Sequence, residues 1–281
     1  MKMNGLVVVN KEKNKTSRDV VNELTHLLST KKIGHTGTLD PIATGVLVCL
    51  IGKYTKLVPL ITSLDKEYIA EVKLGIKTDT GDITGNILEE KDFNITKDDI
   101  LKVFKEFPKS YEQVVPAYSA AKINGKKLYE YARSGEVINL PKRKVNIYSL
   151  ELLDFNNDII TFKTHVSKGT YIRSLINDLC EKLNTIGTMN NLKRTKQGNF
   201  DINNSYTIED LKNNNYKLLN IKEFLNYPVI EINDSLIKQI TNGSKIDNIF
   251  NIEDKVIFTY QNKDIAIYEN VDNMLKPYIM L

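Results

Sequence analysis

The segment from Gly34 to Gly45 constrains this chain more than any other part of it. Its sequence, GHTGTLDPIATG, places three glycines and one proline within twelve residues, a pattern too irregular for a regular helix or strand. Pro41 biases Asp40 toward an extended backbone, and the glycines allow positive φ angles or a close approach of another chain. The sequence therefore predicts a rigid loop that presents one carboxylate. That carboxylate either caps a turn or serves a function.

The composition of the 281-residue chain is ordinary for a soluble globular protein, with 41% hydrophobic and 26% charged residues. The longest apolar run, Val46 to Ile51, is far too short to span a membrane, and the short apolar stretch at 6–9 does not predict a signal peptide. Cys49 and Cys180 are the only cysteines, and the three histidines lack a second ligand at metal-binding spacing. We therefore expect a cytoplasmic, monomeric protein without a membrane segment or a metal site.

Positive charge is unevenly distributed along the chain. Residues 1–200 carry 31 Lys and Arg against 23 Asp and Glu, whereas residues 201–281 carry 8 against 12. The excess is greatest at 122–144, where tyrosines lie between the basic residues. Basic side chains bind polyanions and aromatic rings stack on unpaired bases, so this segment predicts RNA binding, although a solvated charged face explains the lysines equally well. The candidate RNA contacts are Lys126, Lys127, Arg133, Lys142, Arg143 and Lys144.

Apolar periodicity predicts a mixed α+β main domain. Strands are expected at 5–9, 46–51, 68–74, 145–155 and 159–166. Helices are expected to begin at the capping residues Thr16 or Ser17, Thr96 and Thr170, and a short helix is expected at 207–211. Residues 108–143 hold three prolines and a short helical stretch that ends at Gly135, and we expect an insertion that lies over the core without being part of it. From residue 228 the pattern predicts a small β-rich unit, with a first strand, a helix at 234–240, a turn at 242–243 and strands near 255–260 and 264–269.

Few residues remain that can carry chemistry. The chain has no GxxxxGK[ST] or GxGxxG nucleotide motif and no GxSxG nucleophile motif. Asp40 is left, and Arg173 is a candidate partner because it falls in the first turn of a predicted helix. An arginine beside a buried aspartate favours the ionised carboxylate. Most first-turn arginines are surface residues, however, and nothing in the sequence shows that these two side chains meet.

The glycine-rich segment, together with several later ones, resembles the signature of bacterial tRNA pseudouridine-55 synthases of the TruB type. The matching blocks are DKEY at 65–68, LG at 74–75 with TDT at 78–80, VPAYSA at 115–120, GKKLYEYAR at 125–133 and SKGTYIR at 167–173. They occur in the family's order, and their combination is highly specific. The unit from residue 228 resembles the family's short C-terminal RNA-binding module more weakly.

The resemblance implies the pseudouridine synthase fold, an α+β architecture with a mixed, mostly antiparallel central sheet flanked by helices. Residues 1–222 would form the catalytic domain, with the insertion at about 108–143, and residues 223–281 a short PUA-like RNA-binding module. The implied reaction converts uridine to pseudouridine at position 55 in the T-arm of tRNA, by base flipping and without a cofactor or a metal.

The resemblance also implies roles for individual residues. Asp40 corresponds to the nucleophile, with C6 of the uracil and C1′ of the ribose as its alternative targets. Tyr68 would stack on the uracil and assist removal of the C5 proton, while Arg173 would pair with Asp40. The remaining substrate-binding positions are Tyr171, which lines the pocket, Leu192, which packs near the base, His35, which fills the space of the extruded nucleotide, and Lys56, a basic residue near the active site.

Two other functions stay open on the sequence. An RNA-binding or tRNA-folding module without chemistry has the same basic and aromatic features, and only the set of Asp40, Tyr68 and Arg173 separates it from an enzyme. A glycoside hydrolase also acts at an anomeric carbon, but it normally needs two carboxylates and the motif supplies one. Without the resemblance, Tyr68 and Leu192 are more readily interpreted as core residues.

Overall fold

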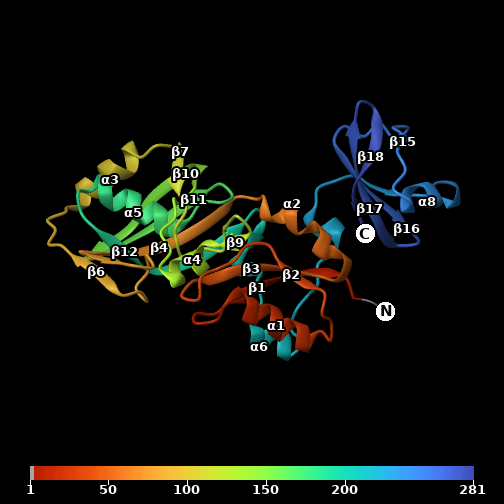
Figure 1. Cartoon of the computed structure of the whole chain (residues 1–281). Helices are drawn as coiled ribbons and strands as arrows, with labels where there is room; N and C mark the ends of the chain where they lie inside the picture. The colour runs from red at the N-terminus through yellow and green to blue at the C-terminus, as the bar shows by residue number, and fades with distance from the viewer. Residues whose placement is uncertain (1–2) are drawn as a thin grey trace.

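The computed structural model describes residues 3–281 and is built on a nine-stranded sheet (Figure 1). The strand pairs of this sheet are antiparallel except β3 with β12, so the predicted mixed, mostly antiparallel sheet is confirmed. The spatial order is β1 (Gly5–Lys11), β3 (Thr44–Ile51), β12 (Gly187–Gln197), β4 (Lys66–Leu74), β11 (Ile159–Val166), β10 (Lys142–Asn156) and β7 (Ser110–Val114); β2 (Ile33–His35) pairs with β3, and β13 (Phe200–Asp201) with β12.

Helices pack on this sheet in two groups. One group lies beside β1 and β2 and the other against β10 and β12. The first contains α1 (Ser17–Leu27) and α6 (Ile208–Lys212), and the second α3 (Lys97–Glu106) and α5 (Ile172–Lys182). Among residues 3–281, no helix combines the length and apolarity that crossing a membrane requires.

The helix starts follow the sequence at three of four positions. Thr96 forms the expected capping box with Asp99, and Thr16 caps its helix as expected. Thr16 and Thr207 also form capping boxes with an aspartate three residues later, which the sequence pattern does not predict. The prediction that Thr170 caps α5 is wrong. Tyr171 is the N-cap residue of that helix, and the Thr170 hydroxyl instead donates to the carbonyl of Ser167, which tightens the turn before the helix.

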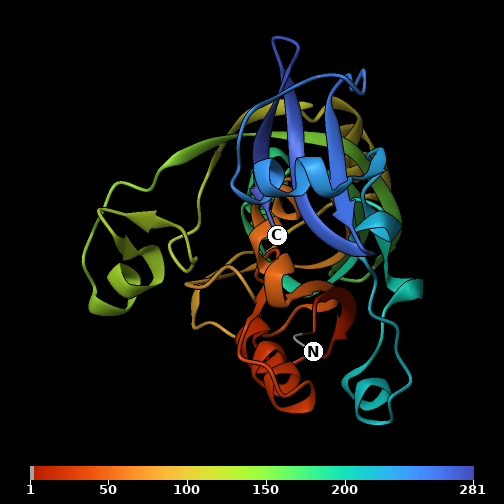
Figure 2. The same ribbon diagram turned by 90° about the vertical axis from the view of Figure 1, so that its right-hand side faces the viewer.

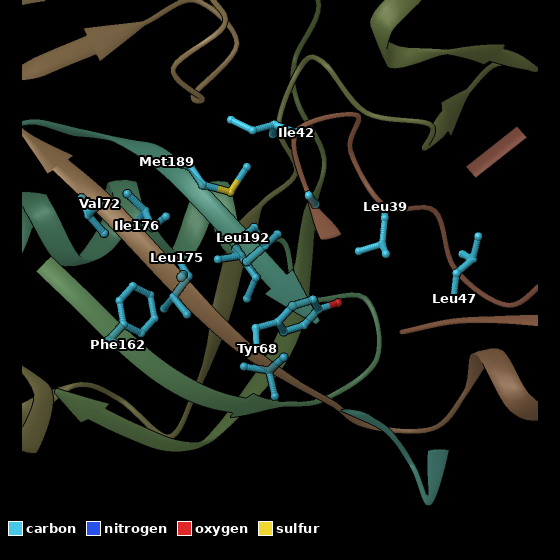
Figure 3. Packing of buried hydrophobic residues seen from close by; sticks show 14 of the residues in the cluster. Leu39, Ile42, Leu47, Tyr68, Val72, Phe162, Leu175, Ile176, Met189 and Leu192 are labelled. Carbon is cyan, nitrogen blue, oxygen red and sulfur yellow. The ribbon is translucent and has the colours of Figure 1, made fainter. Parts of the chain in front are cut away.

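The alternating pattern of β4 sets the packing beneath the sheet. Its residues at 66, 68, 70, 72 and 74 are buried, and the residues between them are partly exposed. Figure 3 shows Tyr68 and Val72 of β4 close to side chains of neighbouring strands and of α5, among them Phe162, Leu175 and Leu192. Burying this apolar surface holds β4, β11 and β12 against the helix.

β12 lies in the middle of the sheet, yet the sequence pattern does not predict it. Its sequence, GTMNNLKRTKQ, contains two large apolar residues, and its buried positions include Thr188, Arg194 and Gln197. Periodicity detects strands through apolar alternation, and a strand whose buried side chains are polar carries no such signal.

The segment predicted as an insertion divides into two parts. Residues 110–114 form β7, which pairs with β10 at the edge of the main sheet, so the prediction that all of 108–143 lies outside the core is wrong for this strand. Residues 116–140, which we call the arm, project away from the sheet (Figure 2). The arm contains the hairpin β8 (Lys122–Ile123) and β9 (Lys126–Lys127), then α4 (Leu128–Ser134), which ends at Gly135 as expected, with φ 70°.

The loop around Asp40 is shorter than its sequence predicts. Gly34 and His35 belong to β2, and Thr44 and Gly45 begin β3, so the irregular part, which we call the Asp40 loop, is residues 36–43. The strand pairing of β2 and β3 continues into the glycine-rich sequence because backbone hydrogen bonds do not require a particular side chain.

The C-terminal unit is a five-stranded sheet with one helix. Its elements are β14 (Val229–Glu231), α8 (Asp234–Thr241), β15 (Ile246–Asp247), β16 (Lys255–Tyr260), β17 (Lys263–Val271) and β18 (Met274–Met280), of which β15 and β18 are not predicted from the sequence. Other short elements are η1 (Gly52–Leu57), α2 (Val58–Thr62), β5 (Ile76–Thr78), β6 (Ile87–Glu90), η2 (Ile202–Asn204) and α7 (Ile221–Phe224).

The C-terminal unit is docked on the segment that follows β3. Ile257 and Ile267 share an apolar cluster with Leu57 of η1. The Tyr54 hydroxyl donates to Asp264 at 2.5 Å and accepts the backbone N–H of Ile221 at 2.9 Å. Apolar burial and a buried hydrogen-bond relay therefore fix this unit to the main domain.

Gly45 marks the place where β3 and β12 run side by side. It has φ 99°, and a Cβ atom at this position would lie 2.2 Å from the carbonyl oxygen of Arg194. Both its backbone conformation and the close approach of β12 therefore require glycine.

We predict that Gly45→Ala lowers the free energy of unfolding by at least about 2 kcal/mol, because it adds a backbone clash to the strain of a positive φ. Urea unfolding followed by circular dichroism measures the loss. The matched control is Gly135→Ala, where φ is also positive but nothing lies within 4 Å of the added Cβ; that variant should lose about 1 kcal/mol. Equal losses in the two variants would contradict the role assigned to the contact with β12.

Candidate active site

A cleft of about 830 Å³ opens between the Asp40 loop, β4, β12 and the start of α5. The root of the arm and the start of β10 complete its wall. Asp40 is the one acidic residue among the described residues that line it. Six lining residues are basic: Lys66, Arg143, Lys144, Lys168, Arg173 and Arg194. The positive charge of the cleft therefore favours a polyanionic ligand, and Asp40 is the one carboxylate that such a ligand would meet there.

Asp40 and Arg173 form a two-point ion pair. Arg173 Nε lies 3.1 Å from Asp40 Oδ2, and Arg173 Nη2 donates to Asp40 Oδ1 at 3.2 Å. The arginine side chain is 7% exposed and the aspartate side chain 30%. This fork fixes the orientation of the carboxylate while part of its surface still faces the cleft.

Arg173 also binds two backbone carbonyls from other parts of the chain. Its Nη1 donates to Thr80 at 2.8 Å and its Nη2 to Tyr118 at 2.7 Å. Thr80 follows β5, and Tyr118 lies at the root of the arm. The arginine therefore joins the Asp40 loop to two segments that border the site.

The environment of Asp40 acts on its pKa in two directions. Burial raises the pKa of the carboxyl above its ordinary value, and the nearby Asp82 adds to that rise. Arg173 opposes both, because its positive charge favours the ionised form. The pKa remains raised, and a carboxylate held this way is more basic than one in water.

Two buried cations and a serine hold the Asp40 loop. The ammonium of Lys11 donates to the backbone carbonyl of Pro41 at 3.3 Å, and burial lowers the pKa of this lysine to about 8. Arg194 Nη2 donates to the carbonyl of Gly37 at 3.1 Å. The backbone N–H of Leu39 donates to the Ser17 hydroxyl at 2.9 Å. These contacts restrain the loop on both sides of Asp40.

The cleft brings together most of the residues expected to bind substrate. Tyr68, Tyr171, Arg173 and Leu192 line it beside Asp40. Tyr68 and Leu192 are nearly buried, so both also contribute to the apolar core.

Two expected residues lie elsewhere. His35 is half-buried in β2, just before the loop, and accepts a 3.4 Å hydrogen bond from the backbone of Gly37; burial and nearby arginines lower the pKa of its imidazole. Lys56 is exposed on η1 and donates to the carbonyl of Met280 in the C-terminal unit at 2.7 Å. Neither side chain lines the cleft.

The six expected RNA contacts occupy two places. Arg143 and Lys144 line the cleft, and Lys142 precedes them at the start of β10. The other three lie on the arm and contact tyrosines: Lys126 lies 4.2 Å from the ring centre of Tyr131, and Lys127 and Arg133 lie 5.3 and 5.4 Å from that of Tyr129.

Sequence reasoning missed four residues that the fold places in or around the site: Lys11, Lys66, Ser119 and Arg194. Lys66 and Ser119 fall in the quoted blocks DKEY and VPAYSA, so those blocks carried a signal for them. Arg194 lies on the unpredicted strand β12, and Lys11 ends a predicted strand with no local sign of burial.

In residues 3–281, no cluster of three or more His, Cys, Asp or Glu could hold a metal ion.

Two family models match consecutive parts of the chain. The N-terminal domain of TruB family pseudouridylate synthase matches residues 25–172, and the C-terminal domain of tRNA pseudouridylate synthase B matches residues 173–227. Curated relatives named tRNA pseudouridine synthase B include one from Clostridium kluyveri, 41% identical over 98% of both chains, and one from Mesoplasma florum, 42% identical over 96% of this chain and 94% of the relative.

Solved structures share the fold at lower identity. One described as an H/ACA RNP bound to a substrate RNA containing 2′-deoxyuridine aligns with a TM-score of 0.72 at 21% identity, over 98% of this chain and 84% of that chain. A Cbf5–Nop10–Gar1 complex aligns with a TM-score of 0.70 at 22% identity, over 99% and 84%. The matching models and the near full-length relatives lead to one conclusion: the chain belongs to the TruB family of pseudouridylate synthases and is an isomerase of that family.

Proposed function

We propose that this protein converts uridine 55 in the T-arm of tRNA to pseudouridine, with Asp40 as the nucleophile. The observation that carries the proposal is the Asp40–Arg173 pair within a cleft whose other charged lining residues are basic. Relatives named tRNA pseudouridine synthase B support tRNA as the substrate. The quoted resemblance to pseudouridine-55 synthases supports position 55.

The proposed reaction is an isomerisation at one nucleotide. The bond between C1′ and N1 of the uracil breaks, C1′ bonds to C5 of the same ring, and the C5 proton leaves while N1 gains a proton. Asp40 attacks either C6 or C1′ and is regenerated at the end. No electrons are gained or lost overall, so the residues that line the cleft suffice without a redox partner.

Access to the uracil requires the nucleotide to leave its stack. Extruding a base costs a few kcal/mol, and contacts with phosphates offset part of that cost. We assign these contacts to the basic residues at the start of β10 and on the arm. Tyr68 and Leu192 provide apolar surface for the extruded uracil beside Asp40.

Two alternatives fit the site less well. A glycoside hydrolase needs a second carboxylate as acid or base, and Asp40 has no carboxylate partner among the residues that line the cleft. An RNA-binding module without chemistry has no need for a carboxylate in its RNA-binding cleft, because the negative carboxylate repels the phosphates of the RNA. The paired aspartate therefore favours an enzyme.

We predict that Asp40→Asn abolishes tritium release from a T-arm stem-loop labelled at C5 of its uridines, because an amide is a poor nucleophile. The variant should bind the same RNA with nearly unchanged affinity. A stem-loop with cytidine at position 55 is the substrate control. Release at the wild-type rate by the variant would rule out Asp40 as the nucleophile, and equal release from the cytidine-55 RNA would rule out position 55.

The pH dependence of turnover should report the raised pKa of Asp40. Only the carboxylate is nucleophilic, so kcat/KM should fall as pH decreases through that pKa, at a higher pH than the ordinary aspartate value of about 3.9. Arg173→Gln removes the charge that favours ionisation and should move this limb to still higher pH. The control is Arg143→Gln, which removes a cleft arginine that is not bonded to Asp40. It should weaken RNA binding and leave the acidic limb of the pH profile where it is. If Arg173→Gln does not move that limb, Arg173 does not control the pKa of Asp40.

Reversal of the charges at Lys142, Arg143 and Lys144 to Glu should weaken RNA binding and flatten its salt dependence. Each lost phosphate contact lowers the slope of log K against log salt by about one. The matched control reverses three exposed lysines of α3, Lys97, Lys102 and Lys105, with the same change in net charge. Similar slopes for the two triple variants would remove the start of β10 from the RNA-binding surface.

A further inference from the structure

Five buried side-chain polar atoms in residues 3–281 have no hydrogen-bond partner: Thr36 Oγ1, Ser119 Oγ, Thr185 Oγ1, Gln197 Oε1 and Asn270 Oδ1. Folded proteins contain few such atoms, because each costs about 1–3 kcal/mol. Two of the five belong to residues that line the cleft, Thr36 and Ser119. Thr36 is fully buried, whereas Ser119 is 5% exposed, at the root of the arm.

The backbone of Ser119 is fixed on both sides. Its N–H donates to the carbonyl of Ala117 at 3.0 Å, and its carbonyl accepts the N–H of Tyr129 at 3.1 Å. The side chain therefore has one freedom left, rotation about the Cα–Cβ bond. Serine has three staggered rotamers, and rotation among them changes the direction of the hydroxyl of a residue that lines the cleft.

Ser119 and Asp40 line the same cleft, and Arg173 links the chain beside Ser119 to Asp40. The carbonyl of Tyr118, the neighbour of Ser119, accepts from Arg173 Nη2 at 2.7 Å, and the same nitrogen donates to Asp40 Oδ1 at 3.2 Å. One guanidinium nitrogen thus bridges the chain beside Ser119 and the carboxylate. A nucleotide in contact with Asp40 comes within reach of this stretch of the arm root.

We propose that Ser119 is a substrate contact, whose hydroxyl forms a hydrogen bond with the target uridine nucleotide when that nucleotide enters the cleft. The inference rests on the proposed function, and it adds a residue to which that function gives no role. The hydroxyl is left without a partner in the free protein because the nucleotide provides the partner. The hydroxyl can donate to a carbonyl oxygen of the uracil or to an oxygen of the ribose, and it can accept from an N–H of the uracil or an O–H of the ribose.

The test depends on what is lost when the hydroxyl is removed: removal of a hydroxyl that stabilises the fold would lower the melting temperature, whereas removal of one that contacts substrate would lower turnover. Ser119→Ala removes an atom that has no partner in the free protein, so the melting temperature should stay unchanged or rise. In contrast, kcat/KM for tritium release from the T-arm stem-loop should fall about two- to tenfold, the worth of one hydrogen bond. The matched control is Thr185→Val, which removes another unpaired buried hydroxyl, one outside the cleft lining. By the same argument its melting temperature should stay unchanged or rise, whereas its kcat/KM should stay unchanged.

A binding measurement separates this proposal from the identity of the reaction. In an Asp40→Asn background, the dissociation constant for the same stem-loop should rise about two- to tenfold on adding Ser119→Ala and stay constant on adding Thr185→Val. Failure of wild-type protein to release tritium would overturn the proposed function and leave this binding comparison as the test of Ser119. Unchanged binding in the Ser119→Ala pair, or a lower melting temperature with the loss of turnover, would overturn the contact.

Discussion

The ion pair between Asp40 and Arg173 is the interaction on which the site depends. A carboxylate in a partly buried position loses hydration and favours its neutral form, whereas the role that we propose for Asp40 requires the ionised form. Arg173 counters that loss through two contacts with Asp40, at 3.1 and 3.2 Å. Because the same guanidinium binds the carbonyls of Thr80 and Tyr118, the charge on Asp40 is linked to the placement of two flanking segments.

The loop that carries Asp40 is positioned by two buried cations, and the sequence around them does not predict that they are buried. Lys11 and Arg194 are both almost fully buried and donate to loop carbonyls instead of to carboxylates. Backbone carbonyls carry partial charge only, so these cations keep most of their positive potential. Arg194 is itself one of the basic residues that line the cleft, and both cations favour an anionic ligand there, consistent with an RNA-modifying isomerase.

Parts of the fold and site follow from sequence because their causes are local. The helix caps at Thr16 and Thr96 join residues three apart, and the alternation of β4 repeats every second residue. β12 shows the opposite case, because its buried side chains are largely polar and its hydrogen bonds come from strands far away in the chain. Lys56 shows a further limit: a family position suggests the active site, but the bond of its ammonium goes to the C-terminal unit.

From the amino-acid sequence alone, one aspartate is placed on an irregular loop before a proline, and SKGTYIR is placed where a loop leads into a helix. The ordered blocks also identify the family, because they occur together. The contact between Asp40 and Arg173, 133 residues apart, is visible only in the folded chain, as are the contacts of Arg194 and Lys11 with the Asp40 loop. Such contacts depend on strand order and on the burial of charge, which are properties of the whole packed chain and not of any short segment of it.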